Sequence, residues 1–320
     1  MYICRVCDGP RSEQSYWVRE MMFGNRTEFE YFGCSVCGCL QIASVPPDLR
    51  KYYSNGYYSL NEEPVQPGFL KKFLKRQRSL YGLGRKNLLG LIAARKYGLP
   101  DVYEWARKTK LSFTSRILDV GCGKGFLLLK LEEEGFTDLA GIDPYLDTDI
   151  TCGKRVKIFK KEIAEVDGEF DFVMLNHSFE HMAEPLSVLK DVYRVLKRDR
   201  FALVRIPVVP SYAWRTYGVN WVQLDAPRHL FLHSVQSMKL LSERAGFELT
   251  EVVYDSGNLQ FWGSELYSRN ISMTEYNKSV DENPQNSMFS SNDLGRFKEK
   301  ARELNGLGDG DQACFYLRKP

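Results

Sequence analysis

The sequence predicts an α/β fold around a mainly parallel sheet, and two observations in its middle part carry this prediction. An apolar run at 117–120 leads into a turn with glycine at every second position, and an apolar helical segment follows at 126–131. A second apolar run at 139–142 then ends in Asp143. Glycine lets a ligand approach the backbone closely, and an acid at the end of the next strand suits the hydroxyls of a ribose. We therefore expect a strand–helix–strand unit that binds an adenosine-containing cofactor.

The chain after residue 115 continues this alternation of strands and helices. Apolar runs predict further strands at 156–159, 170–175, 201–207, 247–255 and 312–317. Segments with helical spacing lie at 186–196 and 237–246. The stretch 270–295 is rich in Asn, Ser, Asp and Glu, and this composition predicts a mobile insert there.

The turn after the first strand discriminates between cofactors. It reads Asp119-x-Gly121-x-Gly123-x-Gly125. A dinucleotide loop has its third glycine inside the helix, and a P-loop needs Ser or Thr where Gly125 follows Lys124. The turn instead resembles motif I of the class I S-adenosylmethionine-dependent methyltransferases. This resemblance implies a Rossmann-like, seven-stranded class I methyltransferase fold over 115–320. It also implies that Asp119 lies near the ammonium group of the cofactor and that Asp143 binds its ribose. An NAD-dependent oxidoreductase is a distant alternative.

The resemblance extends to two later segments. Glu162 and Ile163 follow the predicted strand at 156–159, where this family contacts the adenine ring. Asn176 and His177 begin a segment similar to the Asn-x-x-x-Glu-His element of many small-molecule methyltransferases, which closes over the methionine end of the cofactor. The resemblance thus implies a cofactor site formed by Asp119, Gly121, Gly123, Gly125, Asp143, Glu162, Ile163, Asn176 and His177.

Two pairs of cysteines near the start of the chain predict a metal site. Cys4 and Cys7, and likewise Cys34 and Cys37, are separated by two residues and lie in short turns. Two such turns can place four thiolates tetrahedrally around a structural Zn²⁺ ion. Residues 1–50 resemble the zinc ribbons that precede the catalytic domain in some bacterial methyltransferases. Disulfide bonds are the alternative, which a cytoplasmic chain disfavours.

The segment 51–114 is expected to form a helical linker or lid. Tyrosines lie close together at 52, 53, 57 and 58, either packing between domains or covering a ligand. Residues 71–96 contain nine Lys or Arg and no acid. They predict either helices with a solvated basic face or a site for an anion such as a nucleotide-diphosphate sugar, an acidic glycan or a lipid headgroup.

All four histidines lie in two segments, 177–181 and 225–233. A hydroxyl acceptor must lose a proton, most simply to a histidine or carboxylate within hydrogen-bond reach. The second segment resembles the Asp-x-Pro-Arg-His-Leu element of bacterial methyltransferases associated with surface polysaccharides. It also loosely resembles an element of deoxysugar C-methyltransferases, which use that histidine as a base. The resemblance implies His229 as the catalytic base and His181 as second choice, unless both are structural. Arg228 stands where the C-methyltransferases carry a glutamate, which favours transfer to oxygen.

The sequence therefore predicts an enzyme that transfers a methyl group to a hydroxyl of a sugar, glycan or other small metabolite, as in polysaccharide biosynthesis. An RNA methyltransferase, a sugar C-methyltransferase and a non-catalytic binding protein are the alternatives. Nucleic acid is not expected as a partner, because the net charge is only +3 and no Asn/Asp-Pro-Pro-aromatic motif follows the fourth strand. The chain has no long apolar run and no signal peptide, so we expect a cytoplasmic protein without a membrane span. Peripheral membrane contact and the oligomeric state stay open.

Overall fold

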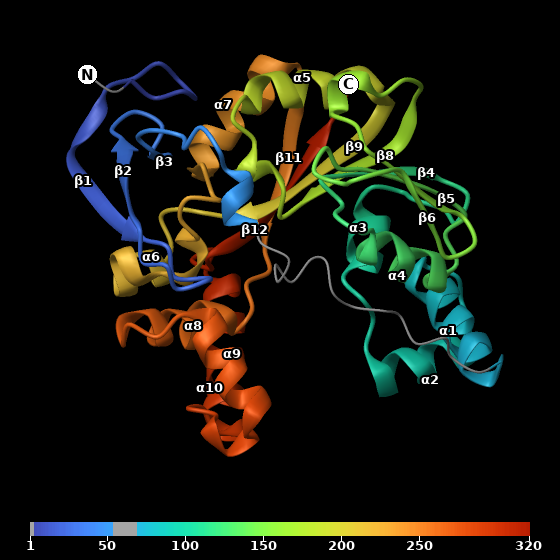
Figure 1. Ribbon diagram of the computed structural model, residues 1–320. Coiled ribbons are helices and arrows are strands. Elements are labelled where there is room, and N and C mark those ends of the chain that lie inside the picture. Colours follow the sequence, from blue (N-terminus) through green and yellow to red (C-terminus); the bar gives the residue numbers. More distant parts are fainter. Residues whose placement is uncertain (1–2, 54–68) are drawn as a thin grey trace.

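A computed structural model describes the backbone of residues 3–53 and 69–320, and their side chains except those of 69–72. Two sheets organise this part of the chain (Figure 1). The larger has eight strands in the order β11-β12-β9-β8-β4-β5-β7-β6, and the smaller has four in the order β1-β2-β3-β10. Among the helices in the described ranges, none combines the length and the apolar character needed to cross a membrane.

The larger sheet has the strand order of a Rossmann-like class I methyltransferase. Its parallel strands are β4 (Arg116–Val120), β5 (Asp138–Ile142), β7 (Val156–Phe159), β8 (Phe170–Asn176) and β9 (Leu196–Pro207). β12 (Gln312–Arg318) runs antiparallel between β9 and β11 (Glu248–Tyr254). The predicted fold is confirmed, with one more strand than the seven expected. The extra strand, β6 (Ile150–Cys152), pairs antiparallel with β7 at the edge, and its three residues are too short to give a sequence signal.

Helices cover both faces of the larger sheet, with α5 (Pro185–Val195) and α7 (Val235–Ala245) on one side and α3 (Val102–Lys108) and α4 (Phe126–Glu134) on the other (Figure 1). Side chains of β4 alternate between the two cores: Leu118 joins the core under α5 and α7, while Ile117 joins the core under α3 and α4. A parallel sheet buried on both faces explains why its strands read as continuous apolar runs.

The linker segment is helical where it is described. α1 (Phe69–Gly82) and α2 (Leu88–Tyr97) precede α3, and α1 packs on α4. Lys75 lies 2.5 Å from Glu133, and Arg78 lies 2.7 Å from Glu134. Part of the positive charge of 71–96 is therefore neutralised by acids of α4. Tyr57 and Tyr58 lie outside the described residues.

The smaller sheet combines two distant parts of the chain. Its first three strands are β1 (Arg11–Arg19), β2 (Glu28–Cys34) and β3 (Leu40–Ile42), and its fourth is β10 (Phe231–Leu232). Phe231 pairs with Gln41 in this register. Because only Leu230 separates His229 from β10, the N-terminal sheet includes a strand next to the segment that carries the expected base.

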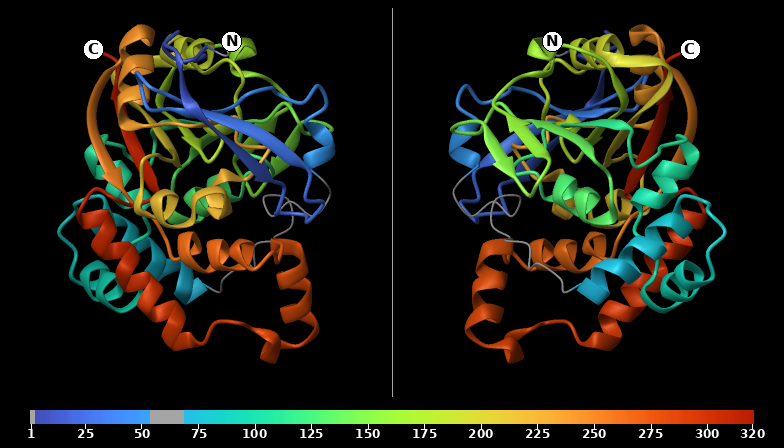
Figure 2. Two further views of the ribbon diagram at one scale, coloured as in Figure 1. Left: turned by 90° about the vertical axis from the view of Figure 1, so that its left-hand side faces the viewer. Right: turned by 90° about the vertical axis from the view of Figure 1, so that its right-hand side faces the viewer.

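The stretch 270–295 contains helices, although its composition predicted a mobile insert. Helices α8 (Leu259–Ser268), α9 (Met273–Glu282) and α10 (Ser291–Gly306) form a layer below the larger sheet (Figure 2). Ser272 caps α9, and the Met273 amide donates to the Met21 carbonyl oxygen at 3.0 Å. The shorter helices are α6 (Tyr212–Tyr217), η1 (Arg50–Tyr52), η3 (Ile163–Glu165), η4 (Phe179–His181), η5 (Gly218–Asn220), η6 (Val222–Leu224) and η7 (Pro284–Asn286).

Candidate active site

The glycine turn between β4 and α4 has a backbone that only glycine adopts readily. Gly121, Gly123 and Gly125 have φ values of +74°, +54° and +79°. A Cβ atom on Gly121 would lie 2.5 Å from Cβ of Ser178. A Cβ atom on Gly125 would collide with the Ile158 side chain. The turn therefore leaves its backbone bare at the carboxyl edge of the sheet, as the sequence pattern predicted.

Two acids flank this turn, as expected. Asp143 follows β5, and its Oδ2 accepts a hydrogen bond from the Gly123 amide at 2.9 Å. Its Oδ1 accepts from the Tyr145 amide at 2.9 Å, which leaves lone pairs of both oxygens for a ligand. Asp119 is buried in β4, and burial together with the nearby Asp143 raises its pKa to about 8. A cationic ligand group beside Asp119 would be needed to keep that carboxyl ionised at neutral pH.

The expected adenine residues lie after the neighbouring strand of the same edge. Ile163 is buried in η3, whereas Glu162 is exposed and caps that turn. The Arg194 guanidinium donates to the Ile163 carbonyl oxygen at 3.1 Å and fixes the turn against α5. Because β7 pairs with β5, these residues share the carboxyl edge with Asp143.

The segment after β8 packs directly on the glycine turn. Ser178 donates from its hydroxyl to the Val120 carbonyl oxygen at 2.6 Å. Arg205 donates from Nη1 to Oδ1 of Asn176 at 3.1 Å and to Nε2 of His177 at 3.0 Å. Since Nε2 of His177 accepts, the proton of a neutral ring is on Nδ1, which lies 3.6 Å from Oε1 of Glu180.

Glu180, His181 and His229 come together beside this turn, and we call them the His–Glu cluster. One possible ligand atom from each of the three lies within 4.8 Å of the others. Nε2 of His229 is 3.8 Å from Oε1 of Glu180, and the two imidazole rings meet edge to face at 4.7 Å. The structure thus brings together both histidines that the sequence nominated and adds Glu180 as their common neighbour.

The charges of the cluster are set by burial and by mutual contacts. Burial opposes ionisation of Glu180, but the facing His177, His181 and His229 outweigh it and lower the Glu180 pKa to about 2. Burial and the neighbouring His229 lower the pKa of His181 to about 4. At neutral pH, Glu180 is therefore a carboxylate and His181 a neutral imidazole.

The segment that carries His229 is anchored by a buried arginine. Arg228 is completely buried, and its guanidinium contacts Glu20 at 2.9 Å and Asp225 at 2.9 Å. It also donates to the Tyr52 carbonyl oxygen at 2.9 Å. The Asp225–Arg228 spacing was visible in the sequence, but the partner Glu20 lies 208 residues away and had no signal.

A described part of the tyrosine-rich segment reaches the cluster. The hydroxyl of Tyr53 lies 3.0 Å from Nδ1 of His181, and the Tyr53 ring stacks on Tyr145 at 5.7 Å between centroids. Tyr53 therefore connects the turn of Asp143 with the His–Glu cluster.

Comparison with known families identifies the domain that contains the glycine turn and the His–Glu cluster. The profile of the methyltransferase domain family matches residues 84–252, which is more than half of the chain. The chain belongs to this family. The match includes the glycine turn, Asp143 and the whole His–Glu cluster, so the domain is of the S-adenosylmethionine-dependent methyltransferase type.

Curated relatives of the methyltransferase domain are distant. A ubiquinone biosynthesis O-methyltransferase of Pseudomonas aeruginosa is 25% identical over 155 residues, covering 43% of this chain and 66% of that protein. A tRNA U34 carboxymethyltransferase of Campylobacter jejuni is 23% identical over 147 residues, covering 43% of this chain and 50% of that protein. The chain therefore spans slightly less than two thirds of the first relative and half of the second.

Solved structures similar to the methyltransferase domain include a mycolic acid cyclopropane synthase complexed with SAH and CTAB. It has a TM-score of 0.46 and 15% identity, covering 70% of this chain and 85% of that chain. A SAM dependent methyltransferase from Archaeoglobus fulgidus has a TM-score of 0.41 and 18% identity, covering 69% and 100%. The fold assignment rests on the strand order itself.

The four predicted cysteine ligands converge in front of the methyltransferase domain. One Sγ atom from each of Cys4, Cys7, Cys34 and Cys37 lies within 4.8 Å of the others. The Cys4–Cys37 and Cys7–Cys34 sulfur pairs are 3.6 and 3.5 Å apart. Backbone amides donate to the sulfurs of Cys4 and Cys34 at 3.4 Å. Four cysteine sulfurs at this spacing fit a tetrahedral ion with metal–sulfur bonds of about 2.3 Å.

The remaining histidine and cysteine of this region belong to the core. His233 is fully buried, stacked between Phe179 and Phe231 with its Nδ1 facing Ser237 at 3.1 Å. Cys39 is also fully buried, and its Sγ lies 3.9 Å from that ring nitrogen. Neither residue belongs to the cysteine or the His–Glu cluster.

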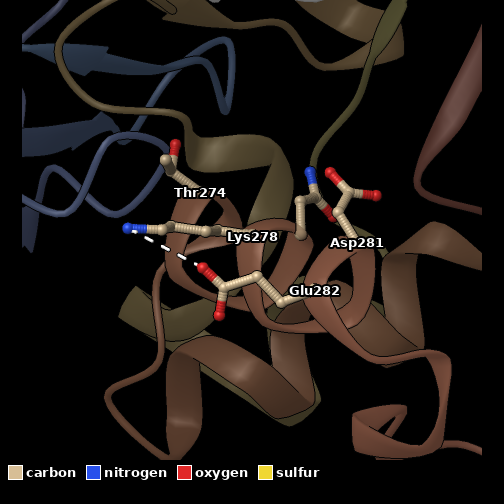
Figure 3. Close-up of a pocket in the computed structure, with 5 residues that line it drawn as sticks. Thr274, Lys278, Asp281 and Glu282 are labelled. Carbon is tan, nitrogen blue, oxygen red and sulfur yellow. Dashed lines mark ion pairs between the residues drawn. The ribbon is translucent and has the colours of Figure 1, made fainter.

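A further hollow lies along α9. It is lined by Thr274, Asn277, Lys278, Asp281 and Glu282 of that one helix (Figure 3). Lys278 and Glu282 form an exposed ion pair at 4.0 Å. The hollow has no buried polar group and shares no residue with the glycine turn, so it is not assigned a role in the reaction.

Proposed function

We propose that the protein transfers a methyl group from S-adenosylmethionine to a hydroxyl of a sugar, glycan or other small metabolite. One observation carries this proposal: residues 178–181 pack on the glycine turn at one end and supply Glu180 and His181 of the His–Glu cluster at the other. A cofactor site and a group that takes up a proton therefore adjoin each other, as methyl transfer to oxygen requires.

The cofactor would be held by groups of the carboxyl edge. Asp143 binds the ribose hydroxyls, Asp119 faces the ammonium group, and Ile163 with Glu162 borders the adenine. The bare backbone of the glycine turn lets the methionine part lie close to the chain. His177 and the adjacent Asn176 close over the methionine end, held in place by Arg205.

The acceptor proton leaves through the His–Glu cluster. Among its histidines, His229 is the stronger candidate because its Nε2 faces Glu180 and because Nδ1 donates to the Gln223 carbonyl oxygen at 2.7 Å. The carbonyl can only accept, so a neutral ring has an unprotonated Nε2. His181 remains second, since burial and the neighbouring His229 lower its pKa to about 4, which makes it a weak base at neutral pH.

Structural zinc in the cysteine cluster is the second part of the proposal. The ion would join the turns of Cys4 and Cys34, which flank a sheet that incorporates β10. The Ser234 hydroxyl donates to the Cys37 carbonyl oxygen at 2.5 Å, so the turn that contains Cys34 and Cys37 is in direct contact with the start of α7. Zinc would thus support the segment that carries His229 without taking part in the reaction.

The named activities of the relatives do not single out one acceptor, and they differ in the group transferred, since one is an O-methyltransferase and another a tRNA carboxymethyltransferase. An RNA acceptor has less support because Lys75 and Arg78 of the basic segment are paired with acids of α4. Transfer to carbon also has less support, since the residue before His229 is Arg228, which pairs with Glu20 and Asp225, and not the glutamate of the C-methyltransferases.

The test begins with calorimetric titration of S-adenosylmethionine and S-adenosylhomocysteine. We expect one site in the wild type and at least a tenfold loss of affinity in Gly121→Ala, because the new Cβ meets Ser178 and the φ of +74° is strained. Gly257→Ala is the matched control, since its Cβ would meet nothing within 4 Å. Incubation with labelled cofactor and candidate nucleotide sugars or cell extracts then identifies the acceptor. A wild type that binds neither molecule would refute the proposed function.

A further inference from the structure

The cysteine cluster is not the only convergence of metal-binding side chains in the described part of the chain. We propose that Glu180, His181 and His229 bind one divalent first-row transition-metal ion. The proposal deepens the proposed function, on which it rests for the reaction, because it names what holds and activates the oxygen of the acceptor.

The distances suit ligands of one ion better than direct hydrogen bonds. Nε2 of His229 and Oε1 of Glu180 are 3.8 Å apart, which is too far for a hydrogen bond. Metal–nitrogen and metal–oxygen bonds of roughly 2.0–2.2 Å place two ligands of one ion about 3–4 Å apart. His181 completes a set in which one ligand atom from each residue lies within 4.8 Å of the others.

The hydrogen bonds of the rings prepare them for this role. Nδ1 of His229 donates to the Gln223 carbonyl oxygen, and Nδ1 of His181 donates to the Arg228 carbonyl oxygen. Carbonyl acceptors of this kind fix ring orientation and tautomer in metal-bound histidines. In the neutral rings, Nε2 is left as a lone pair, and in His229 this lone pair faces the carboxylate of Glu180. The Nε2 lone pair of His229 and the Glu180 carboxylate are both electron-pair donors, so a cation between them would bind both.

Glu180 supplies a second, independent observation. Its side chain is 0% exposed, and neither carboxylate oxygen has a hydrogen-bond partner among the described residues. A buried carboxylate without such partners is costly, and a coordinated cation removes that cost.

The charges around the site also call for a cation. The buried Arg228 pairs with Glu20 and Asp225, and the buried Glu180 lies on the other side of His229, whose Nε2 is 3.8 Å from both Glu180 and Asp225. These three carboxylates are thus accompanied by one buried guanidinium. With neutral histidines their formal sum is −3 + 1 = −2. The nearby Arg205 is paired with Asp255 at 2.6 Å and does not change this balance. One divalent ion would neutralise the group.

The ligand types indicate which ions fit and what they would do. Two imidazoles and one carboxylate favour manganese, iron, cobalt or zinc over magnesium and leave coordination positions open. With Nε2 of His229 bound to the ion, His229 would not act as the base. An acceptor hydroxyl bound at an open position would have a lowered pKa, and its proton would pass to water. The oxygen then forms a bond to the methyl carbon while the carbon–sulfur bond breaks and its electron pair stays on sulfur. The products are a methyl ether and uncharged S-adenosylhomocysteine.

Titration with Mn²⁺, followed by electron paramagnetic resonance, tests the site on the full chain. Mn²⁺ reports the His–Glu cluster because thiolate sites select softer ions such as Zn²⁺. We expect one bound Mn²⁺ per wild-type chain and at least tenfold weaker binding in both Glu180→Gln and His229→Gln. Glu184→Gln is the matched control, since Glu184 is exposed and lies nearby in the sequence. Circular dichroism verifies that each variant is folded.

The outcomes separate this site from the proposed function. Gly121→Ala should lose cofactor affinity but keep Mn²⁺ binding, whereas Glu180→Gln should keep cofactor affinity but lose Mn²⁺. Wild-type protein that binds no Mn²⁺, or Glu180→Gln that binds it as tightly as wild type, would overturn the metal site. The methyltransferase assignment would survive that result, with His229 itself accepting the proton.

Discussion

Single side chains of the site are held in charge states that differ from those in water. Asp119 is the clearest case, because burial and the neighbouring Asp143 raise its pKa to about 8. In the free protein this acid is therefore largely protonated at neutral pH. The ammonium group of a bound cofactor favours the carboxylate, so cofactor binding and loss of this proton are linked.

This linkage predicts how affinity depends on pH. Between about pH 6 and pH 7.5, the affinity for S-adenosylmethionine should rise with pH, approaching tenfold per unit, because binding releases the Asp119 proton. Calorimetric titration in buffers of different ionisation enthalpy measures both the affinity and the proton release. Asp119→Asn should bind weakly with a much flatter pH dependence. A wild type whose affinity is constant over this range would contradict the role of Asp119.

At the scale of elements, the segment between η6 and β10 depends on the buried pairs of Arg228. Glu20 comes from the turn after β1, and Asp225 from the turn after η6, so one guanidinium joins two elements. The Tyr31 hydroxyl adds a hydrogen bond to the His229 carbonyl oxygen at 2.8 Å. The position of His229 is therefore set by side chains of the smaller sheet.

Arg228→Ala should lower the free energy of unfolding by about 3–5 kcal/mol, because two buried carboxylates lose their counter-charge. Chemical denaturation monitored by circular dichroism measures this change. Arg269→Ala serves as the control, since Arg269 forms an exposed i,i+4 ion pair with the partly exposed Glu265 at 3.6 Å and the loss of this pair should cost well under 1 kcal/mol. Similar losses in the two variants would show that the Arg228 pairs are not important for stability.

The elements differ in how far sequence could predict them. The glycine turn, Asp143 and the strand pattern are local, because the glycine spacing and each apolar run lie within a few consecutive residues. The contact between Glu180 and His229 depends on η4 meeting the turn after η6, and the sequence placed both histidines in the site without pairing them. The bond from Glu20 to Arg228 joins positions 208 apart, so no local pattern could reveal it.

For the molecule as a whole, the cysteine cluster and the reaction site are connected through the smaller sheet. Gln41 donates from Nε2 to Sγ of Cys4 at 3.1 Å and pairs with Phe231 of β10. Arg5 stacks over the Phe231 ring at 4.6 Å. Loss of zinc should therefore disturb the segment after His229 more than the glycine turn, which lies on the larger sheet.

This connection predicts separable effects of zinc removal. Cys37→Ser should lose zinc and most methyl transfer, while affinity for the cofactor should fall less, because the cofactor contacts lie at β4 and β5. Mass spectrometry of bound metal, calorimetry and turnover measure the three quantities. Cys39→Ser is the control and should keep zinc, since Cys39 lies outside the four-cysteine group. Full turnover in zinc-free Cys37→Ser would show that the ion is dispensable.

Strand β10 belongs to the sheet of the N-terminal strands, and this limits how the protein can be truncated or recombined. If the chain were cut near residue 50, Leu230, Phe231 and Leu232, all completely buried, would be left without the N-terminal strands that cover them. An uncovered apolar strand edge favours aggregation. The N-terminal strands and the methyltransferase domain would therefore have to be inherited together during evolution. Replacing residues 1–50 with those of another protein would require compensating substitutions around residues 230–232.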